Sequence, residues 1–488
     1  MRVAFVYPPF KKGQKVAFLP QNRQFVYSSS KEVRLYPVLA ATAATMLRQA
    51  GHTVFWLDGI TENLSMAETL RRLKAFEPDL VITETKAPVA GKTWGFVDSL
   101  KKRWKDVKVA LVGDHVTYFP KECLKESRAD YVLTGGDWDF LAVNLAEHLE
   151  KDEKLENGVY FRAGKMIRST GEFIPNHNLD QSPLIDRDLT RFWKYKEADV
   201  LSPCAYMMFG RGCGGVDGRP GACTFCIWQH CLWALKPRLR SPEHVVSEIR
   251  FLVGKYKIRE IFDDTDGGAH YDFAWLSQFY ELLKKEKLLG KIKFSANSRA
   301  DVLDKKTCRL LKKCGFRMLK VGVEAGTDRT LKMIGKGETT EIIRWGVKNA
   351  KDAGLIVHLS AMVGYPWEKE EDAAATLSFM KELLFYKTRV GDSLQASVIV
   401  PYPGTPLWNQ AERHSWFIID SHKFEKYDMS QPVLKSNIDN AYWCKKIWNI
   451  HLHPVFLLKT TLSVRSFNDI KFLMRGAFSH FGHVTDYE

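Results

Sequence analysis

Three cysteines in a short, glycine-rich stretch are the residues of this sequence best suited to chemistry. Cys213, Cys223 and Cys226 are separated by nine residues and then by two. The glycines and the proline between the first two oppose a regular helix or strand, so the segment can wrap around a ligand. In a chain that shows no signal peptide, thiolates spaced in this way indicate a soft metal ion or an iron–sulfur cluster rather than disulfides.

Two kinds of metal centre fit these thiolates. A structural zinc ion takes four protein ligands, often from two paired-cysteine motifs. Only one such pair is present here, so zinc would need Cys204 or Cys231 as its fourth ligand. A [4Fe–4S] cluster held by three cysteines instead keeps one iron open for an exogenous ligand. The spacing favours the cluster and leaves zinc as the alternative.

The segments around the cysteines resemble the radical S-adenosylmethionine (radical SAM) enzymes. The resemblance lies in Arg211-Gly-Cys213, in Cys223-Thr-Phe-Cys226-Ile-Trp228 and in the run 238–248. It points to the branch that carries an N-terminal cobalamin-binding-like domain. That family usually separates its cysteines by three residues and then two, so the first arm here is longer by six residues while the ligand number is kept. The resemblance implies that Cys213, Cys223 and Cys226 hold the cluster.

Length and composition restrict the class of protein. At 488 residues, with 45% apolar and 26% charged residues, the chain has the composition of a soluble globular protein of two or three domains. No apolar run reaches the roughly 18 residues of a membrane span. Because the apolar N-terminus is short, we expect a first strand there rather than a signal peptide. We therefore expect a cytoplasmic, reduced protein, with peripheral membrane contact as a further option.

The net charge of +15 is spread along the chain rather than concentrated in a basic tail. A lysine-rich solvated surface, an anionic membrane and a phosphorylated substrate each explain such a charge. The sequence contains no separate RNA-binding appendage, so we do not expect a nucleic-acid partner.

Residues 1–150 alternate short apolar runs with helical patterns. Strands are predicted at 2–7, 54–57, 80–83, 107–112 and 131–133, and helices at 37–51, 66–76, 94–104 and 139–150. Near-continuous β-branched runs separated by helices are typical of a doubly wound, Rossmann-like parallel sheet. Ligands bind such sheets beyond the carboxyl ends of the strands.

The turns at those strand ends resemble the cobalamin-binding domain of the same radical SAM branch. The resemblance assigns the cobalamin contacts to Pro9, Thr83, Gly113, His115, Gly135 and Gly136. The sequence has Asp114 where the family's first turn usually has a second glycine, and it has no Asp-x-His-x-x-Gly motif. We therefore expect His115 to be a turn or pocket residue rather than a cobalt ligand. Cobalamin is a candidate cofactor that the sequence alone does not decide.

A second alternation follows a polar linker at 151–203. Its predicted strands are 205–209, 258–262, 292–296, 319–323, 356–363 and 394–400. Six β/α units over 204–408 predict a partial (β/α)6 barrel, and the cysteine loop follows the first strand at the edge where such barrels carry their chemistry. Residues 409–488 form a helical region. It either caps the core or presents Trp448, Phe456, Phe472 and Phe478 to lipid.

Polar residues gather at the other strand ends of the predicted barrel. The segments Gly322-Val-Glu324-Ala-Gly326 and Gly364-Tyr-Pro366 resemble signatures of the family. The resemblance implies that Glu324 and Arg299 bind the polar ends of S-adenosylmethionine. It also places Gly364 and Pro366 on that cofactor's side, Phe225 against the adenine, and Asp264 on the substrate side.

The expected function follows from this resemblance. An electron donor such as ferredoxin or flavodoxin would reduce the cluster, and S-adenosylmethionine would be cleaved to a 5′-deoxyadenosyl radical that attacks an unactivated carbon. We expect a hydrophobic substrate, with membrane lipids included, that undergoes cyclisation, rearrangement or methylation. One alternative is a cobalamin-dependent methyltransferase of a small molecule or peptide. An alternative of another class is a zinc-stabilised nucleic-acid-binding protein.

Overall fold

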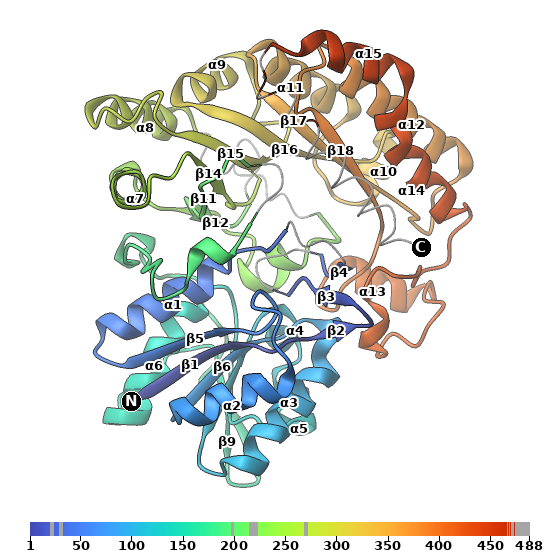
Figure 1. Ribbon diagram of the computed structural model, residues 1–488. Helices are drawn as coiled ribbons and strands as arrows, with labels where there is room; N and C mark the ends of the chain where they lie inside the picture. The colour runs from blue at the N-terminus through green and yellow to red at the C-terminus, as the bar shows by residue number, and fades with distance from the viewer. Residues whose placement is uncertain are drawn as a thin grey trace.

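The computed structural model describes residues 1–19, 24–28, 33–196, 200–213, 223–267 and 272–465, together with 467, 469 and 473. Two large sheets dominate this part of the chain. The sheet built from the N-terminal residues lies in the lower half of Figure 1 and the second sheet in the upper half. The cysteine-containing segment follows the first strand of the second sheet in the sequence.

The first sheet has seven strands in the order β10-β9-β8-β7-β6-β1-β5. The strands are β1 (Arg2–Tyr7), β5 (Thr53–Asp58), β6 (Leu80–Glu84), β7 (Lys108–Val112), β8 (Tyr131–Leu133), β9 (Val159–Ala163) and β10 (Met166–Ser169). The pairs among β5, β1, β6, β7 and β8 are parallel. Their runs of valine, isoleucine and leucine are buried because helices cover both faces. The predicted doubly wound sheet is confirmed.

Six helices accompany this sheet and connect its strands. They are α1 (Val38–Gln49), α2 (Met66–Phe76), α3 (Ala90–Arg103), α4 (Asp114–Tyr118), α5 (Pro120–Glu126) and α6 (Trp138–Lys151). Helix α2 begins where Ser65 accepts a hydrogen bond from the backbone N–H of Glu68. The alanine-rich α1 ends just before Gly51, which has a φ of +92°.

The hairpin β9–β10 lies within the segment that the sequence suggests is a linker. Its first strand pairs antiparallel with β8, through Val132 and Tyr160 among others, and so extends the first sheet. Strand β10 then pairs antiparallel with β9. We propose that the first domain extends to Ser169 and that the linker begins after it.

The second sheet has six strands in the order β11-β14-β15-β16-β17-β18, and every neighbouring pair is parallel. Its strands are β11 (Cys204–Met207), β14 (Glu260–Asp263), β15 (Lys293–Ser298), β16 (Phe316–Glu324), β17 (Ile356–Val363) and β18 (Ser393–Val398). Its helices are α7 (Pro242–Tyr256), α8 (Phe273–Lys285), α9 (Lys305–Cys314), α10 (Asp328–Met333), α11 (Thr340–Asp352) and α12 (Glu370–Phe385). This arrangement is the open six-unit barrel that the sequence predicts.

Shorter elements complete the described residues. Two small sheets consist of β2 (Lys11–Lys12), β3 (Lys15–Ala17) and β4 (Tyr27–Ser28), and of β12 (Gly210–Arg211) with β13 (Arg238–Leu239). The C-terminal helices are α13 (Pro406–Arg413), α14 (Asn440–Trp448) and α15 (Pro454–Ser463). Short helical turns are η1 (Ala87–Val89), η2 (Leu179–Gln181), η3 (Phe192–Lys194), the π-helix η5 (Trp228–Leu232), η6 (Phe424–Lys426) and η7 (Asn449–Leu452). Among the described residues, no helix has the length and apolar character needed to cross a bilayer.

Helix α14 packs onto the second sheet and α15 packs onto α12, which bears on the two roles expected for the C-terminal aromatic residues. The Phe456 ring is buried. The indole N–H of Trp448 donates to the Ala396 carbonyl at 2.8 Å. The buried Phe456 ring therefore does not meet lipid, and the half-buried Trp448 side chain is held against β18. Phe472 and Phe478 lie outside the described residues.

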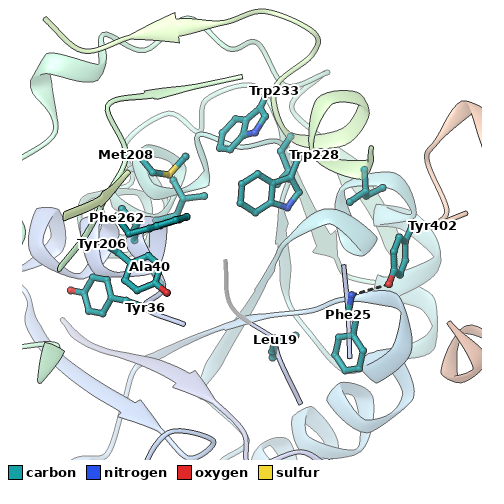
Figure 2. Close-up of a cluster of buried hydrophobic side chains, with 14 of the residues drawn as sticks. Leu19, Phe25, Tyr36, Ala40, Tyr206, Met208, Trp228, Trp233, Phe262 and Tyr402 are labelled. Atoms are coloured by element: carbon teal, nitrogen blue, oxygen red, sulfur yellow. Dashed lines mark hydrogen bonds between the residues drawn. The ribbon is translucent and has the colours of Figure 1, made fainter. Parts of the chain in front are cut away.

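The two halves of the molecule share one apolar core. Figure 2 shows Tyr36 and Ala40 of the first domain beside Tyr206, Met208 and Phe262 of the second. In the same cluster the backbone N–H of Phe25 donates to the hydroxyl of Tyr402 at 2.8 Å. Because side chains of both domains bury one another, the domains form a single packed body.

Candidate active site between the two sheets

The three predicted cluster ligands flank the carboxyl edge of the second sheet. Cys213 follows β12, and its backbone N–H donates to the side-chain oxygen of Gln229 at 3.0 Å. Cys223 and Cys226 precede η5, and the N–H of Cys226 donates to the carbonyl of Cys223 at 3.0 Å. Residues 214–222, the nine residues that separate Cys213 from Cys223, lie outside the described residues.

The charges around the thiols are suited to holding a cluster of several irons. Burial raises the pKa of Cys213, and nearby Asp266 acts in the same direction, while the Arg299 guanidinium opposes the rise. Burial also raises the pKa of Cys223, and the charges of Lys336 and Arg299 oppose it. Both cations therefore favour the thiolate form that binds iron.

The spacing of the thiols also bears on the type of centre. No three potential ligands among the described residues lie close enough to share one metal ion. A [4Fe–4S] cluster places each thiolate on a different iron, so its ligands stand further apart than those of a single ion. A Cβ atom at Gly267 would lie 2.3 Å from the sulfur of Cys213, so only glycine leaves room for this thiol. The donor set fits a cluster with three cysteine ligands.

Glu324 lies at the end of β16 in a strained and crowded position. Its φ of +68° is in the left-handed region, which residues other than glycine adopt uncommonly. A Cβ atom at Gly322 would lie 2.2 Å from the Glu324 carboxylate, which explains the glycine two residues earlier. The ammonium of Lys336 lies 3.6 Å from Glu324 and 3.2 Å from Glu338. Burial raises the pKa of Glu324, and Lys336 opposes the rise.

Arg299 and Tyr365 bring unpartnered polar atoms to this acidic group. The Arg299 guanidinium pairs with Asp301 at 2.7 Å and donates to the Lys336 carbonyl at 2.8 Å. Its second terminal nitrogen, Nη1, is buried without a hydrogen-bond partner in the described part of the chain, as is the hydroxyl of Tyr365. Orphaned buried donors beside a carboxylate fit a ligand that carries an amino group and a carboxylate at one end, as S-adenosylmethionine does.

The remaining predicted contacts of this cofactor have different surroundings. Asp264 is buried and accepts a hydrogen bond from the Asn297 amide at 2.9 Å, while Phe225 is half-buried. Gly364 (φ +88°) packs against the Asn440 side chain, and the Pro366 carbonyl accepts a hydrogen bond from Asn437 at 3.0 Å. The C-terminal region therefore supports this end of β17.

The facing edge of the first sheet carries a second group of unpartnered polar atoms. The hydroxyls of Thr83 and Thr85 and the Nδ1 atom of His115 are buried, and among the described residues none has a hydrogen-bond partner. Gly113 (φ +114°) brings two strand ends close together, since a Cβ atom there would lie 2.6 Å from the Thr85 carbonyl. Orphaned acceptors and donors at the carboxyl ends of parallel strands fit a large polar cofactor such as cobalamin.

The neighbours of His115 explain why it is a pocket residue. Its ring packs against Phe424 and Phe119, with centroid separations of 4.7 Å and 5.6 Å. Burial lowers the pKa of His115 to about 4, so the ring is neutral at physiological pH. The adjacent Asp114, which occupies the place of the family's glycine, pairs with buried Lys86 at 2.7 Å.

The other predicted cobalamin contacts have close neighbours within the protein. A Cβ atom at Gly135 would overlap the Phe173 ring, and one at Gly136 would overlap the Trp233 ring. The N–H of Gly136 donates to the carbonyl of Leu232 in η5 at 2.8 Å. Pro9 lies against Gly59 at the end of β5. These turns therefore contact the protein, and Gly136 joins the first domain to the segment that follows the cluster ligands.

Sequence reasoning missed an ionic network that fixes the cysteine loop to the first domain. Arg211, two residues before Cys213, pairs with Asp137 at 2.7 Å and also with Asp139. Arg238 pairs with Asp137 at 2.6 Å, and both aspartates are fully buried. The available signal was the Asp137-x-Asp139 pair at a strand end, which the sequence alone does not connect to Arg211.

Comparisons with known proteins agree with this geometry. Residues 210–380 match the model of the radical SAM superfamily, and residues 29–141 match that of the B12 binding domain. The chain therefore contains a radical SAM domain and a B12-binding domain. It is a radical SAM enzyme, whose radical SAM domain implies a [4Fe–4S] cluster and S-adenosylmethionine, and its B12-binding domain supports cobalamin as a third cofactor. The match to the radical SAM model argues against the zinc-protein alternative.

Relatives and one solved structure extend along most of this radical SAM enzyme. It is 27% identical to an uncharacterized methyltransferase of Pyrococcus horikoshii, over 90% of this chain and 93% of the relative. It is 25% identical to the anaerobic magnesium-protoporphyrin IX monomethyl ester cyclase of Rubrivivax gelatinosus, over 89% of this chain and 74% of the relative. The radical S-adenosylmethionine methyltransferase TsrM of Kitasatospora setae, solved with cobalamin and a [4Fe–4S] cluster, has the same fold, with a TM-score of 0.66, 13% identity and full coverage of both chains.

Proposed function

We propose that this enzyme is a cobalamin-dependent radical SAM methyltransferase. The observation that carries the proposal is that each domain has a group of buried polar atoms with no hydrogen-bond partner among the described residues. Thr83, Thr85 and His115 lie at the edge of the B12-binding domain, and Arg299 and Tyr365 lie beside the cysteine loop. Helix α4, which contains His115, packs against η5 just after Cys226. Two cofactor sites that adjoin in this way support transfer between them.

When bound, S-adenosylmethionine and the cluster supply a carbon-centred radical, and cobalamin supplies a methyl group. The residues of the chain bind and orient these groups. Glu324 and Arg299 would hold the amino and carboxylate ends of S-adenosylmethionine, while Lys336 keeps the Glu324 carboxylate in place. Trp228 and Trp233, whose rings meet edge to face at 6.0 Å, exclude water from the junction.

We also propose that the methyl acceptor is hydrophobic. The support is the aromatic character of the junction, where Tyr118, Phe119 and Trp408 contact one another beside Cys231. The cyclase relative is named for a porphyrin ester, which is an apolar macrocycle. A peptide or a small polar molecule is the competing class of acceptor.

The reaction type is tested with the anaerobically reconstituted enzyme, hydroxocobalamin and S-adenosylmethionine labelled in its methyl group. Methyl transfer predicts both 5′-deoxyadenosine and S-adenosylhomocysteine, with label entering the cobalamin and then an apolar acceptor such as a polyprenyl lipid or a porphyrin. Release of 5′-deoxyadenosine without S-adenosylhomocysteine would contradict methyl transfer and indicate cyclisation or rearrangement.

A variant pair tests the assignment of Glu324. Glu324→Gln should weaken binding of S-adenosylmethionine at least about tenfold, because a carboxylate facing an ammonium group is worth more than about 1.4 kcal/mol in a buried site. Glu371→Gln on the exposed side of α12 is the matched control. Equal affinity of the two variants, measured by equilibrium dialysis with reconstituted protein, would contradict the assignment.

A further inference from the structure

Apolar side chains collect on the outside of the last two described helical segments. Leu458 and Leu462, one turn apart on α15, are 61% and 65% exposed, and Leu452 in η7 is 55% exposed. Val455 and Leu457 are also exposed. Phe456 and Thr460 of the same helix are buried, so α15 already packs one face inward and presents a second apolar face outward. We call the five exposed apolar residues 452, 455, 457, 458 and 462 the outer face.

The chain segment that contains the outer face carries charged side chains of one sign. Between Asp439 and Asp469 the sequence contains no acidic residue, but it contains Lys445, Lys446, Lys459 and Arg465. In a chain with 57 acidic residues, a stretch of this length would ordinarily include several. Lys445 and Lys446 are exposed on α14, and Lys446 lies over the rings of Tyr442 and Trp443. Lysines beside exposed leucines and a ring-supported ammonium are the composition of a helix that lies at a membrane interface.

The position of the outer face leaves it accessible to a large flat partner. Figure 1 draws α15 at the upper edge of the molecule, away from the first sheet, with α14 along the same side. Helix α15 has ten residues and is about 15 Å long, half the thickness of a bilayer core. It can therefore lie on a bilayer but cannot cross one.

We propose that α14, η7 and α15 dock the enzyme on the surface of an anionic lipid bilayer. The leucines of the outer face enter the acyl boundary while Lys445 and Lys446 meet acidic headgroups. The same α14 begins at Asn440, which packs on Gly364 at the end of β17. The docked segment is thus continuous with the support of the candidate active site. This inference concerns where the enzyme resides and does not depend on the reaction that it catalyses.

The test is vesicle flotation of the full-length holoenzyme with phosphatidylcholine vesicles and with vesicles containing one quarter phosphatidylglycerol. Wild-type enzyme should float with the anionic vesicles about tenfold more than with the neutral ones. Leu458→Gln/Leu462→Gln should reduce this flotation about tenfold, and Lys445→Gln/Lys446→Gln should remove the preference for anionic lipid. All four side chains are exposed, so the replacements leave the core intact.

The matched control is Ile342→Gln/Trp345→Gln on α11, where two apolar side chains are 40% and 64% exposed without being part of the outer face. This variant should float like the wild type. Absence of flotation by the wild type, or an equal loss in the α11 variant, would overturn the proposal. A dimer in light scattering that the Leu458→Gln/Leu462→Gln change converts to monomer, without lipid binding by either form, would assign the outer face to a second copy of the chain and overturn it as well.

Discussion

Glu84 is the residue of the first sheet whose charge should respond most directly to pH. Burial raises its pKa to about 7, Lys86 opposes the rise and Asp114 adds to it, and the Tyr7 hydroxyl donates to Glu84 at 3.0 Å. Because this pKa lies above the value of 4.5 in the unfolded chain, the folded state holds the proton more tightly. The stability due to Glu84 is complete below about pH 4.5 and is lost as the pH rises toward 7.

Replacing this carboxyl by an amide should remove that loss. Glu84→Gln keeps the acceptor for Tyr7 and carries no charge, so the variant should gain about 1–2 kcal/mol over the wild type at pH 8 and little at pH 5. The corresponding difference in Tm is about 2–4 °C per kcal/mol for a domain of this size. Thermal unfolding of both proteins at the two pH values measures it. A Tm difference that stays constant between pH 5 and pH 8 would contradict the assignment.

The three cysteines give a prediction with an internal control. Stable loading of the cluster should be abolished by each of the changes Cys213→Ala, Cys223→Ala and Cys226→Ala. With three thiolates one of the four irons is open, and loss of a thiolate leaves a second iron without a protein ligand. Cys314, which ends α9, is a buried thiol whose pKa burial raises to about 12, so it is an inert packing residue. Cys314→Ala should retain iron and sulfide at the wild-type level after anaerobic reconstitution. Equal iron in all four variants would show that the ligands lie elsewhere.

Among the elements, β12 and the first turn of α6 carry the ionic connection between the domains. Arg211→Ala would leave Asp137 and Asp139 buried with fewer partners, and uncompensated buried carboxylates cost about 3–5 kcal/mol. We expect a lower Tm and faster loss of the cluster, because Arg211 holds the chain just before Cys213. Arg71→Ala, which removes an exposed pair with Glu68 on α2, is the matched control and should change the Tm little. Similar Tm values for the two variants would contradict the structural role of Arg211.

The sequence predicts a strand or helix well when the pattern depends only on residues within that element. Strands β1, β5, β6, β7 and β8 read as unbroken apolar runs because both faces of a parallel sheet are buried. Helix α7 begins at Ser241-Pro242, residue types typical of an N-cap and a first helical position, and Ser241 accepts a hydrogen bond from the backbone N–H of His244. The attachment of β9 to β8 was not predicted, since a hairpin carries no signal for the sheet edge that it joins.

The residues of the candidate site also fall into those that a local motif identifies and those that only the tertiary structure identifies. Site residues within one short motif, such as Gly322-Val-Glu324, can be identified from the sequence alone. The roles of Lys336, Tyr365 and Gln229 depend on side chains meeting across strands or loops, and no local spacing encodes such a meeting. The sequence likewise does not predict that Phe173 packs on Gly135 and Trp233 on Gly136, because these contacts depend on tertiary packing.

At the scale of the whole molecule, the shared core predicts cooperative unfolding. Tyr36 and Ala40 pack with Tyr206, Met208 and Phe262, so separating the domains would expose large apolar surfaces on both. Calorimetry of the cofactor-free protein should therefore show one main transition, and residues 1–169 expressed alone should bind a hydrophobic dye. Two well-separated transitions, or a soluble and dye-free N-terminal fragment, would contradict a common core.

That common core also constrains how the ribosome can make this protein. The last strand of the first sheet ends at Ser169. Phe262, one of the residues that pack with Tyr36 and Ala40, is synthesised almost a hundred residues later. At translation rates of about 5–20 residues per second, the finished first domain waits roughly 5–20 seconds with this apolar face open. During that interval the nascent chain is a substrate for chaperones, and slower synthesis of residues 170–262 lengthens its exposure.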